Sequence, residues 1–249
     1  MRETQGIVER VRQIGGGWQQ IELTIEDAGI AQLKPGQTLL TRTDTSLDPY
    51  LRDHWIPVNR DAEDGILIIE RPLTRRYSPG DVVNIMGPVG SPFLLRPNVR
   101  HLLLLALDYA PTRLLHLMNH ALSTQQASVT LVLTGAARDY PVSNLPPVVE
   151  VITSADPLDW PDQTQSFKWA DQIFAVTSPI FCDDYYSLIF EATRNARHAL
   201  PAEFLYGVYD LPLPCGTGAC MACLVRYKHD HRAACVDGAA FDLAQVRLR

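Results

Sequence analysis

Four of the five cysteines fall close together near the end of the chain, and this density points to metal chemistry. They are Cys215, Cys220, Cys223 and Cys235, and gaps of four, two and eleven residues separate them. Three closely spaced thiols on one loop can converge on a site, and a short hairpin through residues 224–234 would return the fourth. This geometry suits a [2Fe-2S] cluster, in which each of the two irons takes two thiolates. We therefore predict that these four cysteines hold a [2Fe-2S] cluster.

Two other uses of the same thiols remain open. A structural zinc site also takes four cysteines, although it usually takes them as two pairs with gaps of two to four residues. Purely structural thiols are the other alternative. His229 and His231 fall inside the long gap, and we expect them to be surface residues, because four cysteines already complete the coordination. We expect the isolated Cys182 to be a small apolar side chain rather than a ligand.

The bulk composition restricts the classes of function. The chain has 249 residues and a formal net charge of -6. Its 46% hydrophobic and 20% charged residues are typical of a globular protein with a sizeable core. A negative surface repels nucleic acid, and the one basic cluster, Arg71–Arg76, is short. No apolar run reaches the roughly 18 residues that span a bilayer. We expect a cytoplasmic protein with reduced cysteines and with no nucleic-acid or membrane partner.

The pattern of hydrophobic residues divides the chain into three parts. Short strand-like runs separated by glycine and proline turns fill residues 1–97 and predict a β-barrel. Residues 98–210 alternate apolar strands with helical patterns, which is typical of an α/β domain with a parallel sheet. Residues 211–249 are rich in loops and contain the four clustered cysteines. This last part is too small to build its own core, so we expect the cluster to hold it together.

The residues around these cysteines resemble the sequence motifs of a known family. Cys215-Gly-Thr-Gly-Ala-Cys-Met-Ala-Cys and Cys235-Val-Asp-Gly-Ala-Ala-Phe-Asp are similar to the cluster loop and closing segment of the electron-transfer subunit of two-subunit, NAD-linked dihydroorotate dehydrogenases, in the ferredoxin-reductase superfamily. Pro35-Gly36-Gln37, Pro79-Gly80-Asp81 and Gly87-Pro88-Val89-Gly90 are similar to its barrel landmarks. The resemblance implies an N-terminal flavin-reductase-like β-barrel, a Rossmann-like α/β domain and a small C-terminal [2Fe-2S] subdomain.

The sequence departs from that family at both nucleotide sites. The family's flavin strand reads Arg-Pro-aromatic-Ser, whereas Leu51–Pro57 offers Arg52 but no serine, and the phosphate-binding Gly-Thr is reduced to Thr74. The turn Ala106–Pro111 lacks the glycines that a dinucleotide needs and carries an aspartate. The Cys-Gly-Pro segment beside nicotinamide is replaced by Val176–Pro179. We keep FAD open, with Arg52 and Thr74 as its candidate residues, and expect no NAD(P) binding.

Three functions follow from these observations. The leading hypothesis is an electron-transfer subunit that passes single electrons through the cluster to or from a catalytic flavoprotein subunit. The resemblance implies a hetero-oligomer with a dihydroorotate dehydrogenase-like partner in pyrimidine biosynthesis. The second hypothesis is an FAD-containing NAD(P)H reductase with divergent sites. The third is a non-redox assembly protein that the cluster braces. The leading hypothesis requires no catalytic side chain on this chain.

Overall fold

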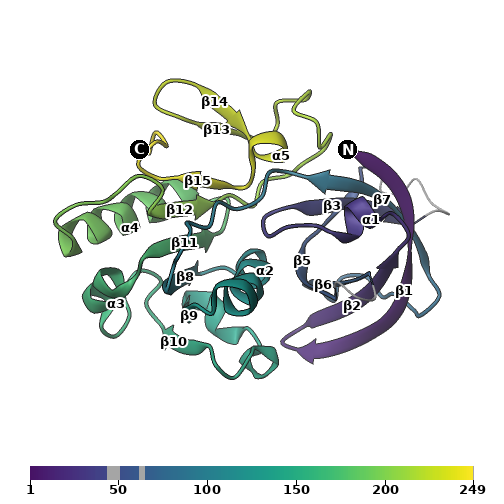
Figure 1. The fold of residues 1–249 in the computed structure, drawn as a ribbon, viewed down its shortest axis with the longest axis horizontal. Helices are drawn as coiled ribbons and strands as arrows, with labels where there is room; N and C mark the ends of the chain where they lie inside the picture. The colour runs from purple at the N-terminus through teal and green to yellow at the C-terminus, as the bar shows by residue number, and fades with distance from the viewer. Residues whose placement is uncertain (44–50, 62–64, 249) are drawn as a thin grey trace.

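The computed structural model describes residues 1–43, 51–61 and 65–248, which form two large sheets and a small hairpin (Figure 1). The first sheet is antiparallel, with the strand order β4-β3-β7-β1-β2-β6-β5. Because β4 and β5 follow one another in the chain and pair with opposite edges, they bend the sheet into a nearly closed barrel. Its strands are β1 (Arg2–Gly15), β2 (Trp18–Ile25), β3 (Thr38–Thr43), β4 (Asp53–Trp55), β5 (Pro57–Asp61), β6 (Ile66–Pro72) and β7 (Val82–Val89).

The barrel strands form because alternate residues can turn to an apolar interior. Along β2, half-buried and buried positions alternate without interruption, as the period of two in a strand requires. Trp55 from β4 is 1% exposed and packs edge-on against Tyr77, with ring centroids 5.2 Å apart. Arg71 of β6 pairs with Asp53 of β4 at 3.4 Å, so an ion pair spans the line where the barrel closes.

The second sheet has the order β10-β9-β8-β11-β12-β15, and every neighbouring pair is parallel except β12 with β15. Six of the seven residues in β8 are buried, because helices and loops cover both faces of a parallel sheet. The strands are β8 (His101–Leu107), β9 (Ser128–Thr134), β10 (Glu150–Ser154), β11 (Gln172–Thr177), β12 (Leu205–Val208) and β15 (Ala240–Asp242). The predicted α/β domain with a parallel sheet is therefore confirmed.

Of the helices that the structure describes, three pack on this second sheet, one lies beside the barrel and one lies in the C-terminal tail. They are α1 (Ala28–Ala31, in the barrel), α2 (Thr112–His120), α3 (Gln163–Trp169), α4 (Cys182–Ala196) and α5 (Ala234–Asp237), with a π turn at Ala121–Gln125 and 3-10 turns at Gly135–Asp139 and Val142–Asn144. The helical patterns expected between the strands of residues 98–210 are confirmed by α2 and α4, whereas the seven residues of α3 are too few to show a clear period. No helix in the described residues is long and apolar enough to cross a membrane.

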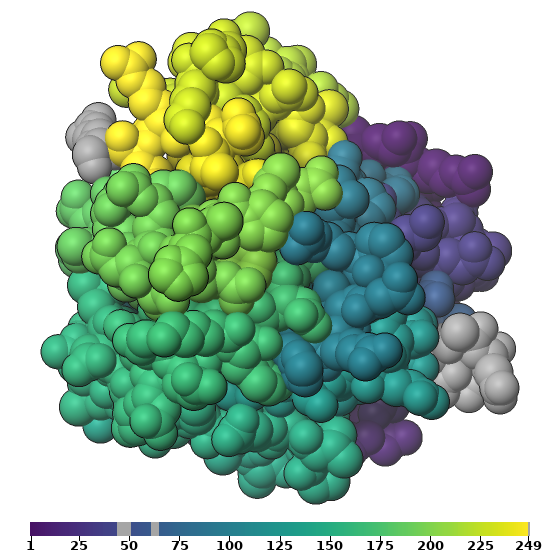
Figure 2. Space-filling view, turned by 60° about the vertical axis from the view of Figure 1, so that its left-hand side comes forward, coloured from purple at the N-terminus to yellow at the C-terminus, as the bar shows by residue number. Residues whose placement is uncertain are grey.

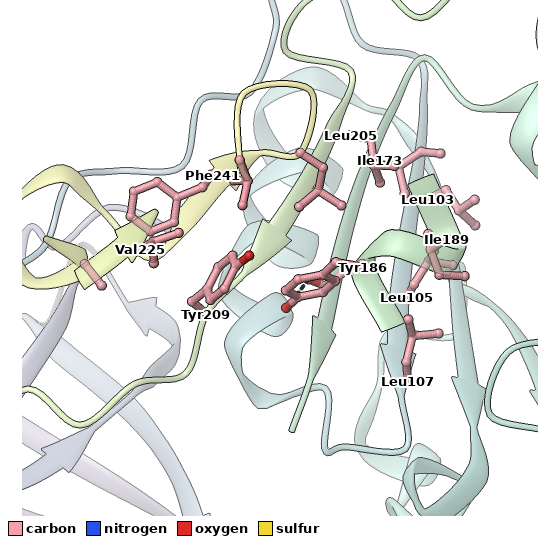
Figure 3. Packing of buried hydrophobic residues seen from close by; sticks show 14 of the residues in the cluster. Leu103, Leu105, Leu107, Ile173, Tyr186, Ile189, Leu205, Tyr209, Val225 and Phe241 are labelled. Carbon is pink, nitrogen blue, oxygen red and sulfur yellow. Dashed lines mark hydrogen bonds between the residues drawn. The ribbon is translucent and has the colours of Figure 1, made fainter. Parts of the chain in front are cut away.

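The C-terminal tail packs on both sheets. Its hairpin, β13 (Leu224–Arg226) and β14 (His231–Ala233), is antiparallel, as the sequence predicts, and β15 completes the second sheet. Val225 and Phe241 of the tail join the apolar core of the α/β domain, where Tyr209 and Phe241 have ring centroids 5.7 Å apart (Figure 3). The space-filling view shows the tail covering one end of both parts (Figure 2). The domain boundaries at residues 97 and 210 stay predictions.

Candidate metal centre

The hairpin of the tail positions the four cysteines. Cys215 and Cys220 lie in the loop before β13, Cys223 directly precedes β13, and Cys235 lies in α5 directly after β14. The register of the hairpin pairs Leu224 with Ala233, so Cys235 returns beside Cys223. The backbone N–H of Cys235 donates to the Cys223 sulfur at 3.4 Å. The structure therefore brings together thiols that are as much as 20 residues apart in sequence.

The four thiols are arranged as two pairs. The sulfur of Cys215 lies within hydrogen-bonding reach of Cys220, and the thiols of Cys223 and Cys235 hydrogen-bond to each other. In the described part of the chain, no three Cys, His, Asp or Glu side chains converge as a site for a single metal ion requires. A [2Fe-2S] cluster takes two thiolates on each iron. The arrangement therefore favours the two-iron cluster over the zinc alternative.

Small residues let backbone N–H groups approach the sulfurs. Gly218 N donates to the Cys235 sulfur at 3.1 Å, and Thr217 N lies 3.5 Å from the Cys215 sulfur. Gly216 and Gly218 have φ values of +65° and +79°, which side chains disfavour. A Cβ on Gly216 would lie 2.9 Å from the Leu40 side chain in the barrel. The loop thus surrounds the sulfurs with N–H dipoles that stabilise negative charge, and glycine at these positions allows the backbone conformation that aims them.

The two pairs differ in exposure and in proton affinity. Cys223 and Cys235 are buried, and Cys220 is exposed. Backbone hydrogen bonds from Thr217 and Cys220 lower the pKa of Cys215 to about 6, whereas burial and the hydrogen bond with Cys223 raise the pKa of Cys235 to about 12. Metal ligands must be thiolates, so bound iron would have to displace the proton of the buried pair. The half-buried Cys215 is the thiol most ready to bind metal as a thiolate, and Cys220 beside it faces solvent.

The remaining cysteine and histidines lie apart from the two pairs. Cys182 begins α4, and its thiol donates to the Pro179 carbonyl at 3.3 Å. Burial raises the pKa of this thiol, as an inert structural cysteine requires. His229 and His231 are exposed in the hairpin. Their positions agree with the surface role expected for them.

The two candidate flavin residues lie at different places in the barrel. Arg52 directly precedes β4, donates to the side chain of Asn84 and pairs with Glu3 at 2.8 Å. Thr74 is exposed in the loop after β6. In the position where the flavin strand has serine, Trp55 is buried in the barrel core. The described residues of this strand therefore do not fit the flavin signature, and the assignment of Arg52 and Thr74 to FAD stays a prediction.

In the turn where the family binds a dinucleotide, the polar groups of this chain form hydrogen bonds with one another. Asp108, after β8, adopts a φ of +53° and accepts a hydrogen bond from Ala136 N at 2.7 Å. A Cβ on Gly135 would lie 2.4 Å from the Asp108 carboxylate, so this carboxylate fills the space between the two turns. A phosphate would need these N–H groups free and would be repelled by the carboxylate. The geometry agrees with the expectation that NAD(P) does not bind here.

Comparison with known proteins supports this picture of the tail. Residues 213–247 match the family model for the iron-sulfur cluster binding domain of dihydroorotate dehydrogenase B, and the resemblance drawn from the sequence is thereby confirmed. The match contains all four clustered cysteines. No curated protein sequence matches the chain.

Solved structures support the fold of the whole chain. An NADH-dependent reduced ferredoxin-NADP oxidoreductase, described as a flavin-based electron-bifurcating enzyme, is 18% identical with a TM-score of 0.76, covering 98% of this chain and 90% of its own. Phthalate dioxygenase reductase, described as modular for electron transfer from pyridine nucleotides to [2Fe-2S], is 13% identical with a TM-score of 0.62, covering 98% and 95%. A ferredoxin NADP+ reductase from Neisseria gonorrhoeae is 11% identical with a TM-score of 0.59, covering 77% and 92%. Together the matches show a ferredoxin-reductase-like fold over the chain and, in residues 213–247, a segment similar to the iron-sulfur domain of dihydroorotate dehydrogenase B.

Proposed function

We propose that this chain passes single electrons through a [2Fe-2S] cluster on Cys215, Cys220, Cys223 and Cys235. The observation that carries the proposal is the arrangement of the thiols within the matched segment 213–247: Cys223 and Cys235 form a buried pair, and the half-buried Cys215 and the exposed Cys220 form a second pair nearer the surface. Fixed thiolates suit electron transfer, because the cluster changes its charge by one unit with little movement of its ligands. The exposed Cys220 gives the cluster an edge that a partner can approach.

The partner is a catalytic flavoprotein of the dihydroorotate dehydrogenase type, which places the chain in pyrimidine biosynthesis as one subunit of a hetero-oligomer. The description of the matched domain supports this choice. Apolar side chains beside the cysteines support a protein partner: Met221 is 68% exposed and Val236 is 49% exposed. Exposed apolar residues around a functional group are typical of a protein interface.

The test is reduction of the cluster, followed by its visible absorption and its electron paramagnetic resonance signal. Dihydroorotate should reduce the cluster when the catalytic flavoprotein is present and should have no effect on the isolated chain. Reduction by dithionite but not by dihydroorotate with the flavoprotein would contradict the proposed partner. A cluster that no reductant reduces would contradict electron transfer and favour the assembly role.

A second candidate function is an FAD-containing NAD(P)H reductase, and the observation that favours it is the fold. Both large parts of the chain have the arrangement found in reductases of pyridine nucleotides. This function predicts that NADH or NADPH alone bleaches the cluster of the isolated chain. The same absorption experiment therefore separates the two candidates.

A further inference from the structure

A polar cluster of one buried and three half-buried residues joins the barrel to the α/β domain. It consists of His54, Tyr109, Arg113 and Asp210, and we call it the cleft cluster. Asp210 follows β12 and accepts hydrogen bonds from the Tyr109 hydroxyl at 2.8 Å and from Arg113 Nε at 2.9 Å. Arg113 Nη2 lies 2.8 Å from the same carboxylate. His54 of β4 reaches across from the barrel, with Nδ1 3.9 Å from Asp210 Oδ1 and Nε2 2.8 Å from Thr38 Oγ1.

The charges of the cleft cluster balance within the chain. The Arg113 side chain is 3% exposed, and burial alone would raise the pKa of Asp210. The ion pair with Arg113 and the hydroxyl of Tyr109 outweigh burial and hold the pKa of Asp210 below its ordinary value. Burial and the nearby guanidinium lower the pKa of His54 to about 3, so His54 is neutral near pH 7. One half-buried anion therefore meets one buried cation, with hydrogen bonds that satisfy the carboxylate.

The members of the cleft cluster come from the segments that differ from the flavin and dinucleotide signatures. His54 lies in the strand that corresponds to the flavin strand, and Tyr109 and Arg113 come from the turn and helix that follow β8. A flat ring that packs between two protein surfaces needs about 7 Å between them, because each face of the ring makes a van der Waals contact of about 3.5 Å. The barrel and the α/β domain approach within 3.9 Å here, between His54 and Asp210. At this point side chains therefore occupy the space between the barrel and the α/β domain.

We propose that the cleft cluster takes the place of flavin and dinucleotide, so that the iron-sulfur cluster is the single redox centre of this chain. This inference deepens the proposed function and rests on it for the presence of the iron-sulfur cluster. Without a flavin between donor and cluster, electrons enter and leave through the same exposed edge, around Cys220 and Met221. Donor and acceptor proteins then compete for one surface, and the subunit works as a shuttle of single electrons.

The first test is the cofactor content of the natively expressed, anaerobically purified full chain. Iron, acid-labile sulfide and acid-released flavin are measured before and after incubation with FAD and gel filtration. We expect iron and sulfide without flavin at both stages. Flavin retained in a one-to-one ratio with the chain would overturn this inference and leave the proposed function standing. Absence of iron and sulfide would overturn the proposed function, and with it the assignment of the redox centre.

The second test is hydrogen exchange of the Asp210→Asn variant, which leaves Arg113 buried without its counter-ion. Amides of residues 53–58 and 112–120 should exchange roughly a hundredfold faster, as the loss of one member of a buried charge pair predicts. The matched control is Glu191→Gln, which breaks an exposed ion pair with Arg194 (3.1 Å) on α4 and should leave these amides unchanged. Exchange equal to the control would overturn the inference. If Asp210→Asn does not fold, the milder Tyr109→Phe variant takes its place, with an expected increase of about tenfold from the lost hydrogen bond.

Discussion

The cysteine loop of the tail and the junction between the two sheets differ in how their polar groups are used. In the loop, backbone N–H groups donate to the cysteine sulfurs, and one of the four thiols, Cys220, is exposed. At the junction, the carboxylates of Asp210 and Glu70 are both satisfied by side chains from another part of the chain. Polar groups that are already paired with other side chains stabilise the fold. Polar groups that lie together with incomplete hydrogen bonding can instead bind a cofactor.

The two regions also depend on different forces. The junction is closed by side chains that the chain itself supplies, so it needs no cofactor to form. The segment from Cys215 to Cys235 contains few buried apolar residues of its own, although β15 anchors the end of the tail to the second sheet. Iron binding would therefore supply the free energy that orders this segment. Variants in each region should separate these two forces, from the largest expected effect to the smallest.

The largest effect should come from Cys223→Ser, which removes a ligand from the buried pair. We expect complete loss of iron, sulfide and visible absorption, because two thiolates on each iron are needed. Amides of residues 215–235 should then exchange fast, while those of β12 stay protected. The matched control is Cys182→Ser, which should keep the full spectrum. A Cys182→Ser protein that lacks its cluster would show that the ligands are assigned wrongly.

The junction contains a second buried contact that should depend on pH. The Tyr140 hydroxyl donates to both oxygens of Glu70, at 2.7 and 2.9 Å, and joins the α/β domain to β6 of the barrel. Burial raises the pKa of Glu70 to about 7 from an ordinary value near 4.5, although the hydrogen bond from Tyr140 opposes this. The folded state therefore binds this proton more tightly than the unfolded state. Its contribution to stability is full below about pH 4.5 and is lost as the pH rises through 7.

The measurement is the melting temperature of the wild type and of Glu70→Gln between pH 5 and pH 8. The amide mimics the protonated carboxyl, so the two proteins should melt together at pH 5. At pH 8 the variant should be the more stable one, by up to about 3 kcal/mol in the free energy of unfolding. A constant difference between the two proteins across this range would show that Glu70 does not titrate in the fold. The stability of the junction would then not depend on the protonation of Glu70.

Local patterns in the sequence predicted much of the fold and the cysteine site, and they failed where partners are distant. The strands, the hairpin and the four cysteines follow from alternation, turn residues and short spacings. Strands β12 and β15 were missed, because three or four residues are too few to show a period. The cleft cluster was missed for a different reason. Asp210 lies 97 residues from Arg113 and 101 from Tyr109, so only the folded chain brings them together.

The smallest effect should come from Gly218→Ala, which alters one N–H dipole at the cluster. Gly218 has a φ of +79° and donates to the Cys235 sulfur at 3.1 Å, and a Cβ there would lie 3.0 Å from Val236. We expect a loss of about 1 kcal/mol in stability from the left-handed backbone.

The matched control is Gly80→Ala, because Gly80 has a φ of +90° and a Cβ added there would have nothing within 4 Å. It carries the same backbone cost without touching the tail. In a redox titration followed by electron paramagnetic resonance, Gly218→Ala should have a more negative potential than the wild type, since a weaker N–H···S bond stabilises the reduced cluster less. Equal potentials for the two variants would mean that this dipole does not act on the cluster, and that Gly218 serves only the turn of the loop.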